Sequence, residues 1–494
     1  MKLSQEKVIL IKLGVTYKEA LSEGDLYKAT SISWKIGEDR LKKGVKYYCP
    51  VYKNQIKEVY NFTGYELDPN VESKGRFILK GSIADDEVRT ILIGRDVSRI
   101  HTSSGNPIKY TSFQDIINVQ DNNSDGYLLN QENLVLTVYR YLQAKGFSFS
   151  LNQVKNLYLS LKSKPFVILS GISGTGKTKI VQLLAESLGA TAENGQLALI
   201  PVRPDWSDGS DLIGYRDIKG DFQEGPLTKV LKEANRPENR NKPYFLLLDE
   251  MNLARVEYYF SDLLSVMESR DRQNGEMVSA PVVEVKEEDG GKLLLRDNFY
   301  IIGTVNMDET THPFSPKVLD RANTIEYNDV VLDHFGFLAN DLIAEPVSID
   351  NKQVAGRFLN LKDAFSDHED LIRKVTELLV EVNAALEPIK AHFGYRVRDE
   401  VCFYMIYNDE GELLEFNEAF DYQLLQKVLP RLTGNDPKTE KALKVLFRFC
   451  TSHEWDESSV DSAIKEAQFP KSAGKLSNMI SKIIYDGFTS FWGS

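Results

Sequence analysis

Apolar residues occur in short, continuous runs in the middle of the chain. Each run is followed at once by glycine, proline, a polar residue or an acidic pair. A strand that is apolar at every position is typical of a parallel sheet covered by helices, where both sides of the strand are buried. The pattern therefore predicts an α/β domain whose parallel sheet contains the segments 165–171, 196–202, 244–250 and 299–305.

Apolar residues recur every three or four positions in the segments on either side of these runs. This spacing predicts amphipathic helices, because it places the apolar side chains on one face. Two helices are predicted before the first strand, at 134–143 and 151–161. The chain after about Tyr327 is predicted to be helical again, with 368–386 and 439–450 as its clearest helices.

The first part of the chain alternates apolar and polar residues with a period of two. That pattern predicts short strands at 26–36, 46–62, 75–84 and 88–94, and so a small β-rich domain. The turn-forming cluster DNNSDG follows and predicts a linker. The predicted organisation is a β-rich domain at 1–118, a linker at 119–132, an α/β domain at 133–340 and an α-helical region at 341–494.

The composition is that of an ordinary globular protein, with 494 residues of which 27% are charged. No stretch approaches the ~18 consecutive apolar residues of a membrane helix. The apolar run near the N-terminus ends at Lys12, which makes it too short for a signal peptide. We therefore expect a cytoplasmic protein without a membrane partner. The three cysteines lack paired spacing, which argues against a disulfide framework or a zinc ribbon.

Charge is divided unevenly along the chain. The net charge is −12, yet residues 1–115 contain 19 Lys and Arg against 15 Asp and Glu. Aromatic residues are interleaved with these lysines, as in Trp34-Lys35 and Lys46-Tyr47. Such a surface can stack on bases and contact phosphates, although strand alternation would place about half of the aromatics in a core. DNA binding and a structural or protein-binding role both remain open for this domain.

A glycine-rich loop, GISGTGKT, follows the first predicted strand and leads directly into a helical segment. Its glycines would let backbone N–H groups surround phosphate oxygens, while Lys177 reaches the β- and γ-phosphates and Thr178 offers a hydroxyl to Mg²⁺. The sequence thus predicts a nucleoside triphosphatase. Its phosphate-binding loop consists of Gly171, Ile172, Ser173, Gly174, Thr175, Gly176, Lys177 and Thr178.

Two carboxylates, Asp249 and Glu250, end the third predicted strand. Ligands of parallel α/β sheets bind at the carboxyl ends of the strands, so both carboxylates are expected near the loop. Asp249 is predicted to hold Mg²⁺ with Thr178, and Glu250 to be the base that polarises the attacking water. The fourth predicted strand leads into Asn306, which could orient that water.

Beyond the loop and the acidic pair, the chain contains VRPDWSDGSDLIGY, EGPL, DEMNLARVEYYFSDLLSVMES, GTVNMDETTHPFSPKVLDRA, FGYRVRDEV and QKVLPRL. Together with GISGTGKTK, these segments resemble the McrB-type branch of AAA+ proteins, which is related to MoxR-like and dynein-related ATPases. The resemblance covers roughly residues 133–431. It implies a P-loop fold with a five-stranded parallel sheet and an α-helical lid.

The resemblance also implies roles for single residues. Asn306 corresponds to sensor 1, Arg321 to an arginine finger that acts on the nucleotide of a neighbouring subunit, and either Arg398 or Arg396 to sensor 2. Arg255 resembles an arginine of the subunit interface. A homo-oligomeric ring, by resemblance a hexamer, is implied, in which a cation supplied in trans stabilises transition-state charge.

The nucleotide base stays open, because McrB proteins use GTP whereas most AAA+ relatives use ATP. The guanine motif NKxD is absent from the sequence. Mg²⁺ is the implied cofactor in either case. The segment 207–227 alternates turn residues with short strands and resembles the hairpin inserted into the second AAA+ helix of this branch.

Several functions are compatible with these features. The first is the motor or regulatory subunit of a McrBC-like restriction system for phage defence, which binds DNA and works with a separate McrC-like nuclease. Residues 1–118 resemble, without a specific motif, a PUA-like or EVE-like barrel, and N-terminal domains of McrB-type proteins often recognise DNA. The alternatives are a MoxR-like remodelling chaperone that acts on protein partners and a nucleotide-gated binding module with slow turnover.

A calcium-loop pattern falls in the predicted linker. Asp121, Asn123, Asp125 and Glu132 match the spacing of EF-hand ligands. The match is single, and a linker rich in Asp and Asn produces it easily. A Ca²⁺ site and a plain linker both remain open.

Overall fold

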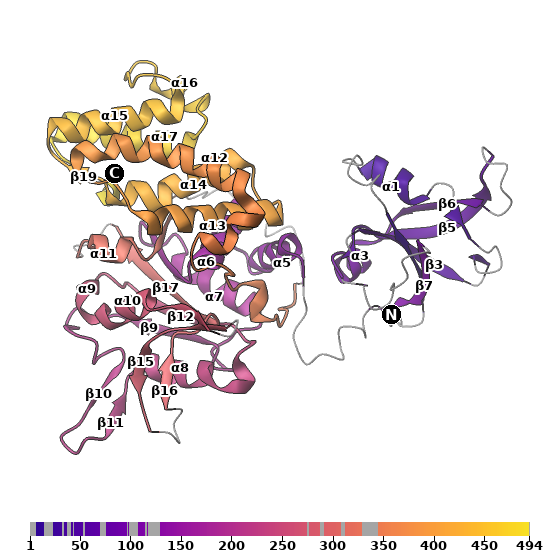
Figure 1. Cartoon of the computed structure of the whole chain (residues 1–494), viewed down its shortest axis with the longest axis horizontal. Coiled ribbons are helices and arrows are strands. Elements are labelled where there is room, and N and C mark those ends of the chain that lie inside the picture. The colour runs from indigo at the N-terminus through magenta and orange to yellow at the C-terminus, as the bar shows by residue number, and fades with distance from the viewer. Residues whose placement is uncertain are drawn as a thin grey trace. The chain divides into compact units, whose positions relative to one another are not determined.

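The chain forms two compact units, Met1–Asn133 and Leu134–Ser494 (Figure 1). Among the described residues, no helix combines the length and apolar content needed to cross a membrane. The computed structural model describes the chain apart from residues 1–5, 14–22, 32–33, 37–40, 43, 53–54, 70–75, 96, 98–106, 114–115, 117–128, 274–275, 287–290, 308–311, 329–343 and 494.

The first unit is built on a mixed sheet with the strand order β2-β6-β5-β3-β1-β7, to which β4 adds by pairing with β3. β1 runs parallel to β3 and antiparallel to β7. Successive side chains point to opposite faces, so Leu10 and Cys49 join one buried cluster and Ile9 and Tyr48 the other. The strands are β1 Lys7–Lys12, β2 Trp34–Lys35, β3 Val45–Tyr52, β4 Gln55–Ile56, β5 Tyr60–Leu67, β6 Arg76–Ile83 and β7 Ile108–Ser112.

Two of the predicted strands of this unit are mainly helical: α1 (Glu23–Ser31) and α3 (Asp86–Leu92) replace them. In α3, Val88 and Leu92 are buried four residues apart, and Ile91 packs against the same cluster. That spacing belongs to one face of a helix, whereas the β-branched side chains in the segment favour a strand. Burial against the sheet outweighs the local preference, so the prediction from residue type is wrong here.

The second unit contains the predicted sheet of five parallel strands, in the order β18-β8-β17-β12-β9. Every residue of β8 is buried, as expected for a strand between two others and beneath helices. The order places β8 beside β17, and β17 beside β12. Because these strands are parallel, the segments that follow them lie together at the carboxyl ends of the strands, which we call the carboxyl edge of the sheet; the opposite ends form the amino edge. The strands are β8 Phe166–Gly171, β9 Leu197–Pro201, β12 Tyr244–Asp249, β17 Phe299–Asn306 and β18 Asn323–Glu326.

Short hairpins extend from this core, and two of them, β10–β11 and β15–β16, project away from the C-terminal helices (Figure 1). The first forms within the segment 207–227 that predicted a hairpin. The helices are α5 Gln131–Ala144, α6 Leu151–Ser163, α7 Lys177–Ser187, α8 Pro226–Asn235, α9 Val256–Tyr259, α10 Ser261–Glu268 and α11 Pro316–Leu319. The added strands are β10 Gly214–Arg216, β11 Phe222–Glu224, β13 Asp271–Gln273, β14 Glu276–Val278, β15 Pro281–Glu284 and β16 Lys292–Leu294.

The C-terminal part is a helical bundle that packs on the core. The predicted helices at 368–386 and 439–450 fall within α12 and α15. α13 packs against α6, and the π-helical turn Leu424–Val428 packs against β18, so the bundle contacts the sheet itself. Its elements are α12 Lys362–Leu386, α13 Tyr395–Gly411, α14 Phe416–Gln423, α15 Pro437–Thr451, α16 Val460–Lys465, α17 Pro470–Asp486, β19 Thr433–Gly434 and β20 Thr489–Ser490.

Candidate functional site

The predicted phosphate-binding loop connects β8 directly to α7. Gly171, Gly174 and Gly176 have φ angles of 150°, 82° and 87°, a region that glycine enters without steric cost. A side chain at Gly171 would also collide with the chain, because a Cβ atom there would lie 2.3 Å from the carbonyl oxygen of Tyr327. The glycines are thus required by the shape of the loop.

Lys177, the first residue of α7, lies inside this loop and is 5% exposed. Its ammonium donates hydrogen bonds to the carbonyl oxygens of Gly171 (3.0 Å) and Ile172 (2.7 Å). The positive charge is therefore held among the backbone groups at the N-terminus of a helix, where the helix dipole also favours an anion. This is the environment expected of a phosphate site.

Asp249 ends β12 and lies beside the loop. Its Oδ1 atom accepts hydrogen bonds from the hydroxyl groups of Thr178 (2.8 Å) and Thr304 (2.7 Å). A hydroxyl and a carboxylate are oxygen ligands of the kind that Mg²⁺ takes in nucleotide sites. The structure thus brings together the two residues predicted to hold Mg²⁺, and the donor set fits that ion.

Thr304 was not predicted as a site residue. Its hydroxyl also accepts a hydrogen bond from the backbone N–H of Glu250 at 3.0 Å, so one side chain links both acidic residues. The signal was present in the strand register, since β12 and β17 pair Leu248 with Gly303 and thereby place Thr304 beside Asp249. That register is not visible in the sequence alone.

Glu250 has a backbone conformation that is uncommon for a residue with a side chain, with a φ angle of 52°. Such left-handed residues cost free energy and are frequent at functional sites. The amide of Asn306 donates a hydrogen bond to Oε1 of Glu250 at 2.8 Å. The predicted base and the predicted sensor residue are therefore in direct contact.

An aromatic cluster lies against the loop at Gly176 and was not predicted from the sequence. A Cβ atom on Gly176 would lie 3.3 Å from the ring of Phe149. That ring stacks on Phe147, with centroids 6.2 Å apart, and meets Tyr327 edge-on at 5.9 Å. The two phenylalanines lie in the connection between α5 and α6, outside every motif of the sequence.

The predicted arginine finger, Arg321, lies at the opposite edge of the sheet. It precedes β18, which runs parallel to β8 with Asn323 beside Val167, so the start of β18 is remote from the loop at the end of β8. The four residues from Val167 to Gly171 span roughly 13 Å along the strand. Arg321 therefore cannot reach the phosphate site of its own subunit.

The two candidates for sensor 2 are not brought to the loop by any contact among the described residues. Arg396 forms an ion pair of 2.5 Å with Glu268, the residue that also pairs with Arg321 at the amino edge of the sheet. Arg398 pairs with Asp399 at 2.7 Å and lies over the ring of Tyr395. The assignment of either residue to the nucleotide stays a prediction.

Arg255 is exposed at the start of α9. Its guanidinium donates a hydrogen bond to the hydroxyl of Tyr258 at 3.2 Å and lies over that ring. The ring is 51% exposed. An exposed arginine stacked on an exposed tyrosine is available to another molecule, and its interface role remains a prediction.

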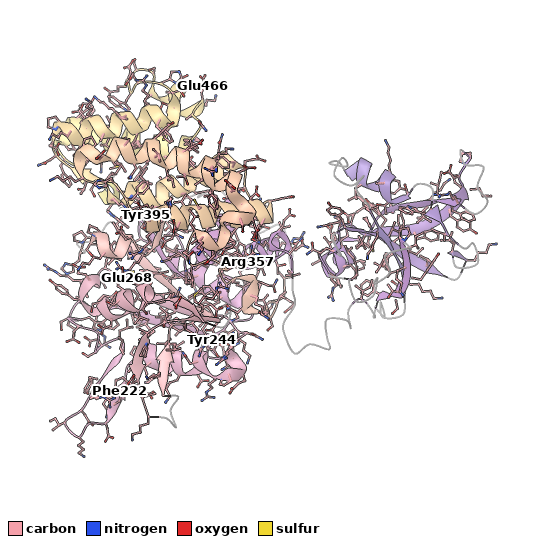
Figure 2. The ribbon with its side chains drawn as sticks, in the orientation of Figure 1. Phe222, Tyr244, Glu268, Arg357, Tyr395 and Glu466 are labelled. Carbon is pink, nitrogen blue, oxygen red and sulfur yellow. The ribbon has the colours of Figure 1, made fainter. Side chains whose placement is uncertain are left out.

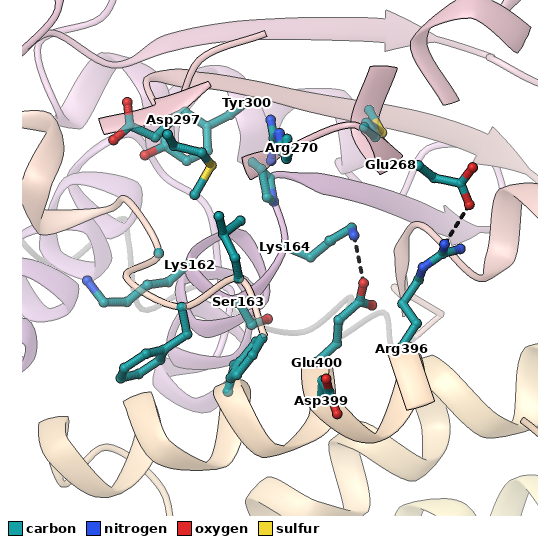
Figure 3. A pocket seen from close by; sticks show the side chains of 17 residues that line it. Lys162, Ser163, Lys164, Glu268, Arg270, Asp297, Tyr300, Arg396, Asp399 and Glu400 are labelled. Carbon is teal, nitrogen blue, oxygen red and sulfur yellow. Dashed lines mark hydrogen bonds and ion pairs between the residues drawn. The ribbon is translucent and has the colours of Figure 1, made fainter. Parts of the chain in front are cut away.

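A cavity of about 260 Å³ lies at the amino edge of the sheet, between the core and α13 (Figure 3). Lys164 and Glu400 face each other across it and form an ion pair of 2.6 Å. Lys162, on the same lining, donates a hydrogen bond to the carbonyl oxygen of Gln353 at 2.8 Å, and burial lowers its pKa to about 7. This cavity is separate from the phosphate-binding loop, which lies at the other edge.

Of the predicted calcium loop, Asp121, Asn123 and Asp125 lie outside the described residues. Glu132 is in the first turn of α5. Within the described part of the chain, no group of three or more His, Cys, Asp or Glu side chains is arranged to hold a metal ion.

A comparison of the sequence with known families agrees with the phosphate-binding loop and the parallel sheet seen in the structure. Residues 166–322 match the family model of the AAA domain, dynein-related subfamily. This part of the chain is an AAA+ domain. With its parallel sheet and phosphate-binding loop, the AAA+ domain is a nucleoside-triphosphate hydrolase of the P-loop class. Residues 346–488, which follow it, match a domain of unknown function (DUF8727).

The chain is also similar to the EcoKMcrB subunit of the type IV methyl-directed restriction enzyme of Escherichia coli (strain K12). The two sequences are 28% identical over 232 residues, which is 47% of this chain and 46% of the relative. The match thus spans about half the length of that curated protein. The resemblance of the AAA+ domain to McrB-type proteins is confirmed.

Two solved structures are similar at low sequence identity. A candidate ATPase from Cytophaga hutchinsonii is 17% identical, with 61% of this chain and 87% of that chain covered and a TM-score of 0.39. The Hsp104–casein complex of S. cerevisiae is 17% identical, with 41% and 36% covered and a TM-score of 0.28. TM-scores this low add nothing to the assignment of the AAA+ domain.

Proposed function

We propose that this protein is a Mg²⁺-dependent AAA+ triphosphatase that assembles into a ring and serves as the motor or regulatory subunit of a McrBC-like restriction system. In this proposal it binds DNA and works with a separate nuclease. The observation that carries the catalytic part is the chain of hydrogen bonds from Thr178 through Asp249 and Thr304 to Glu250 and Asn306. The system-level part rests on the similarity to the EcoKMcrB subunit.

Each residue of this network has a proposed task in hydrolysis. Thr178 and Asp249 would hold Mg²⁺, which supplies positive charge to the phosphate oxygens when it is bound. Glu250 takes a proton from the attacking water, and the hydrogen bond from Asn306 fixes the direction of its carboxylate. Lys177 balances charge on the phosphates.

The ring is supported by the position of Arg321. In the proposed role Arg321 acts on a nucleotide, and because it cannot reach its own phosphate loop, that nucleotide must be held by another subunit. Stabilisation of transition-state charge by such an arginine makes hydrolysis depend on assembly. Exposed Arg255 is the second residue proposed for the interface.

Glu250→Gln tests the catalytic assignment. We expect nucleotide binding and ring assembly to be retained while kcat falls by about 10²–10⁴-fold, the usual contribution of a general base. Exposed Glu238, changed to Gln, is the control and should leave kcat unchanged. Appreciable turnover in Glu250→Gln would refute the role of this carboxylate. Comparing the rates with ATP and with GTP in the same assay would show which nucleotide the enzyme hydrolyses.

DNA binding is tested by gel shifts of the full chain with methylated and unmodified duplexes at several salt concentrations. Reversing the charge of three exposed lysines of the first unit, Lys42, Lys46 and Lys109, should weaken binding by at least about tenfold and flatten its salt dependence. Exposed Lys219 and Lys229 of the AAA+ domain, changed in the same way, are the controls. If the wild type bound neither duplex, a remodelling chaperone that acts on proteins would become the better explanation.

A further inference from the structure

Three consecutive residues at the amino edge of the sheet are each tied to the C-terminal helices. Asp320 pairs with Arg431, and the carbonyl oxygen of Ala322 accepts a hydrogen bond from the ammonium of Lys427 at 2.8 Å. Between them, Arg321 pairs with Glu268, which in turn pairs with Arg396 of α13. The short segment that carries the proposed finger is therefore held by the helical bundle of its own subunit.

Each of the three nitrogens of the Arg321 guanidinium has a partner within its own subunit. Nε donates to the carbonyl oxygen of Leu264 at 3.1 Å, one Nη donates to the carbonyl oxygen of Lys317, and the other forms the ion pair with Glu268. The side chain is 12% exposed. Because both Nη atoms are anchored in this position, the guanidinium must leave Glu268 before it can turn its Nη atoms together toward the phosphate of a neighbour.

Arg396 competes for the same carboxylate. Both guanidiniums contact Oε1 of Glu268, and Figure 3 shows Arg396 reaching this residue from the helix below the cavity. Glu268 lies at the boundary between the core and the bundle, on the side where Tyr395 is labelled in Figure 2. A stronger contact with Arg396 satisfies the carboxylate and weakens its hold on Arg321.

We propose that Glu268 and Arg396 are positioning residues: Glu268 holds Arg321 back, and Arg396 releases it. The proposal rests on the proposed trans action of Arg321. It also connects the two edges of the sheet, because Lys475 of the bundle pairs with Glu326 at 2.8 Å at the other end of β18, next to the phosphate loop. The bundle is thus in contact with both the nucleotide edge and the arginine edge.

The test uses rings mixed from two variants. The acceptor, Arg321→Ala, can hydrolyse but supplies no arginine; the donor, Glu250→Gln, supplies Arg321 but cannot hydrolyse. All turnover in the mixture then comes from acceptor sites served by a donor. Second substitutions are placed only in the donor, so a loss of function at the donor's own nucleotide does not enter the rate.

Glu268→Gln in the donor is expected to raise kcat of the mixture about two- to fivefold, since a partly exposed ion pair that restrains Arg321 is removed. Arg396→Gln in the donor is expected to lower kcat by a similar factor. The donor with both substitutions should behave like Glu268→Gln, because Arg396 acts through Glu268. Glu233, which is 42% exposed and also paired with an arginine, is the matched control for Glu268→Gln and should change nothing.

A merely structural role would lower the rate for both partners of the ion pair. The proposal would be overturned if Glu268→Gln and Arg396→Gln changed kcat of the mixture in the same direction, or if neither changed it. Thermal unfolding and ring assembly are measured for each donor to show that it folds and assembles. If the donor with Glu268→Gln does not fold, Arg396→Lys replaces it in the test. Because this variant keeps the positive charge, kcat of its mixture should lie between that of the parent mixture and that of Arg396→Gln. No turnover in the parent mixture would instead contradict the trans action of Arg321.

Discussion

At the carboxyl edge of the five-stranded sheet, the ends of β12 and β17 are joined to each other by side-chain hydrogen bonds, whereas at the amino edge Asp320 and Glu268 form ion pairs with residues of the C-terminal helical part. Asp249, Thr304 and Asn306 all belong to strands whose relative positions are fixed by the backbone ladder. Glu268 and Arg396 belong to elements that meet only through side chains. The first edge is built to hold one geometry, and the second can change its partners.

The difference has a physical basis. Strand ends that share a ladder cannot shift without breaking many backbone hydrogen bonds, which suits groups that must be placed within a fraction of an ångström for catalysis. Exposed and half-exposed ion pairs contribute only about 0–1 kcal/mol each, so they can exchange at little cost. The proposed reaction centre and the proposed movable contact thus lie at opposite ends of the strands of one sheet.

The largest effect is expected from Lys177→Ala at the fixed edge. Removal of the ammonium leaves the loop without its charge, and nucleotide affinity should fall by at least about 100-fold. Lys179, two residues further along α7 and exposed, is the control. Binding of a fluorescent nucleotide measures both variants, and unchanged affinity in Lys177→Ala would contradict the role of the loop.

The next effect concerns the buried part of the amino edge. Lys427 has no exposed side-chain surface and pairs with Glu400 at 2.6 Å, and Lys164 pairs with the same carboxylate. Lys427→Met should lower the free energy of unfolding by about 3 kcal/mol, because it removes one partner of a buried charge. Chemical denaturation measures it, and exposed Lys441→Met is the control.

The same variant has a signature in acid. Burial alone would raise the pKa of Glu400, but Lys164 and Lys427 together outweigh burial and lower it. A carboxylate with a lowered pKa stabilises the fold above its unfolded pKa, and this stability is lost as the pH falls through the folded value. In Lys427→Met the pKa of Glu400 should rise, so acid unfolding should begin at a higher pH than in the wild type.

A smaller effect is expected from Thr304→Val, which removes one hydroxyl without changing the shape of the side chain much. Loss of its contacts to Asp249 and Glu250 should lower kcat by about tenfold and raise the Mg²⁺ concentration needed for half-maximal rate. Thr228, which is fully buried and bonded to the carbonyl oxygen of Ile213 at 2.6 Å, is the matched control. Thr228→Val should lower stability but leave kcat unchanged, which separates placement at the fixed edge from packing.

Sequence reasoning located the polar groups at the carboxyl edge but not the contacts between them. Asp249, Glu250 and Asn306 each follow an apolar run, so their residue type and place at a strand end could be read directly. Thr304 could not, because its partner is set by the pairing of β12 with β17. Phe149 could not either, since nothing in its own segment links it to a loop that begins more than twenty residues later.

Residue type misled the prediction in the first unit. The segments that became α1 and α3 contain β-branched residues, yet burial on the sheet selected helices. Ion-pair partners could not be predicted from the sequence either, because Glu268 and Arg396 are far apart along the chain and each has many possible partners. Long-range electrostatic contacts leave no periodic signal along the chain.

By itself the sequence determined the α/β class, the apolar runs that form β8, β9, β12 and β17, the phosphate loop and the identity of the groups at the strand ends, because apolar periodicity and glycine content are local properties. The tertiary structure decided which groups touch. It joined Thr178, Asp249, Thr304, Glu250 and Asn306 into one network through strand register, and it placed Arg321 at the far edge in contact with Glu268. Those choices depend on packing between segments that are distant in sequence.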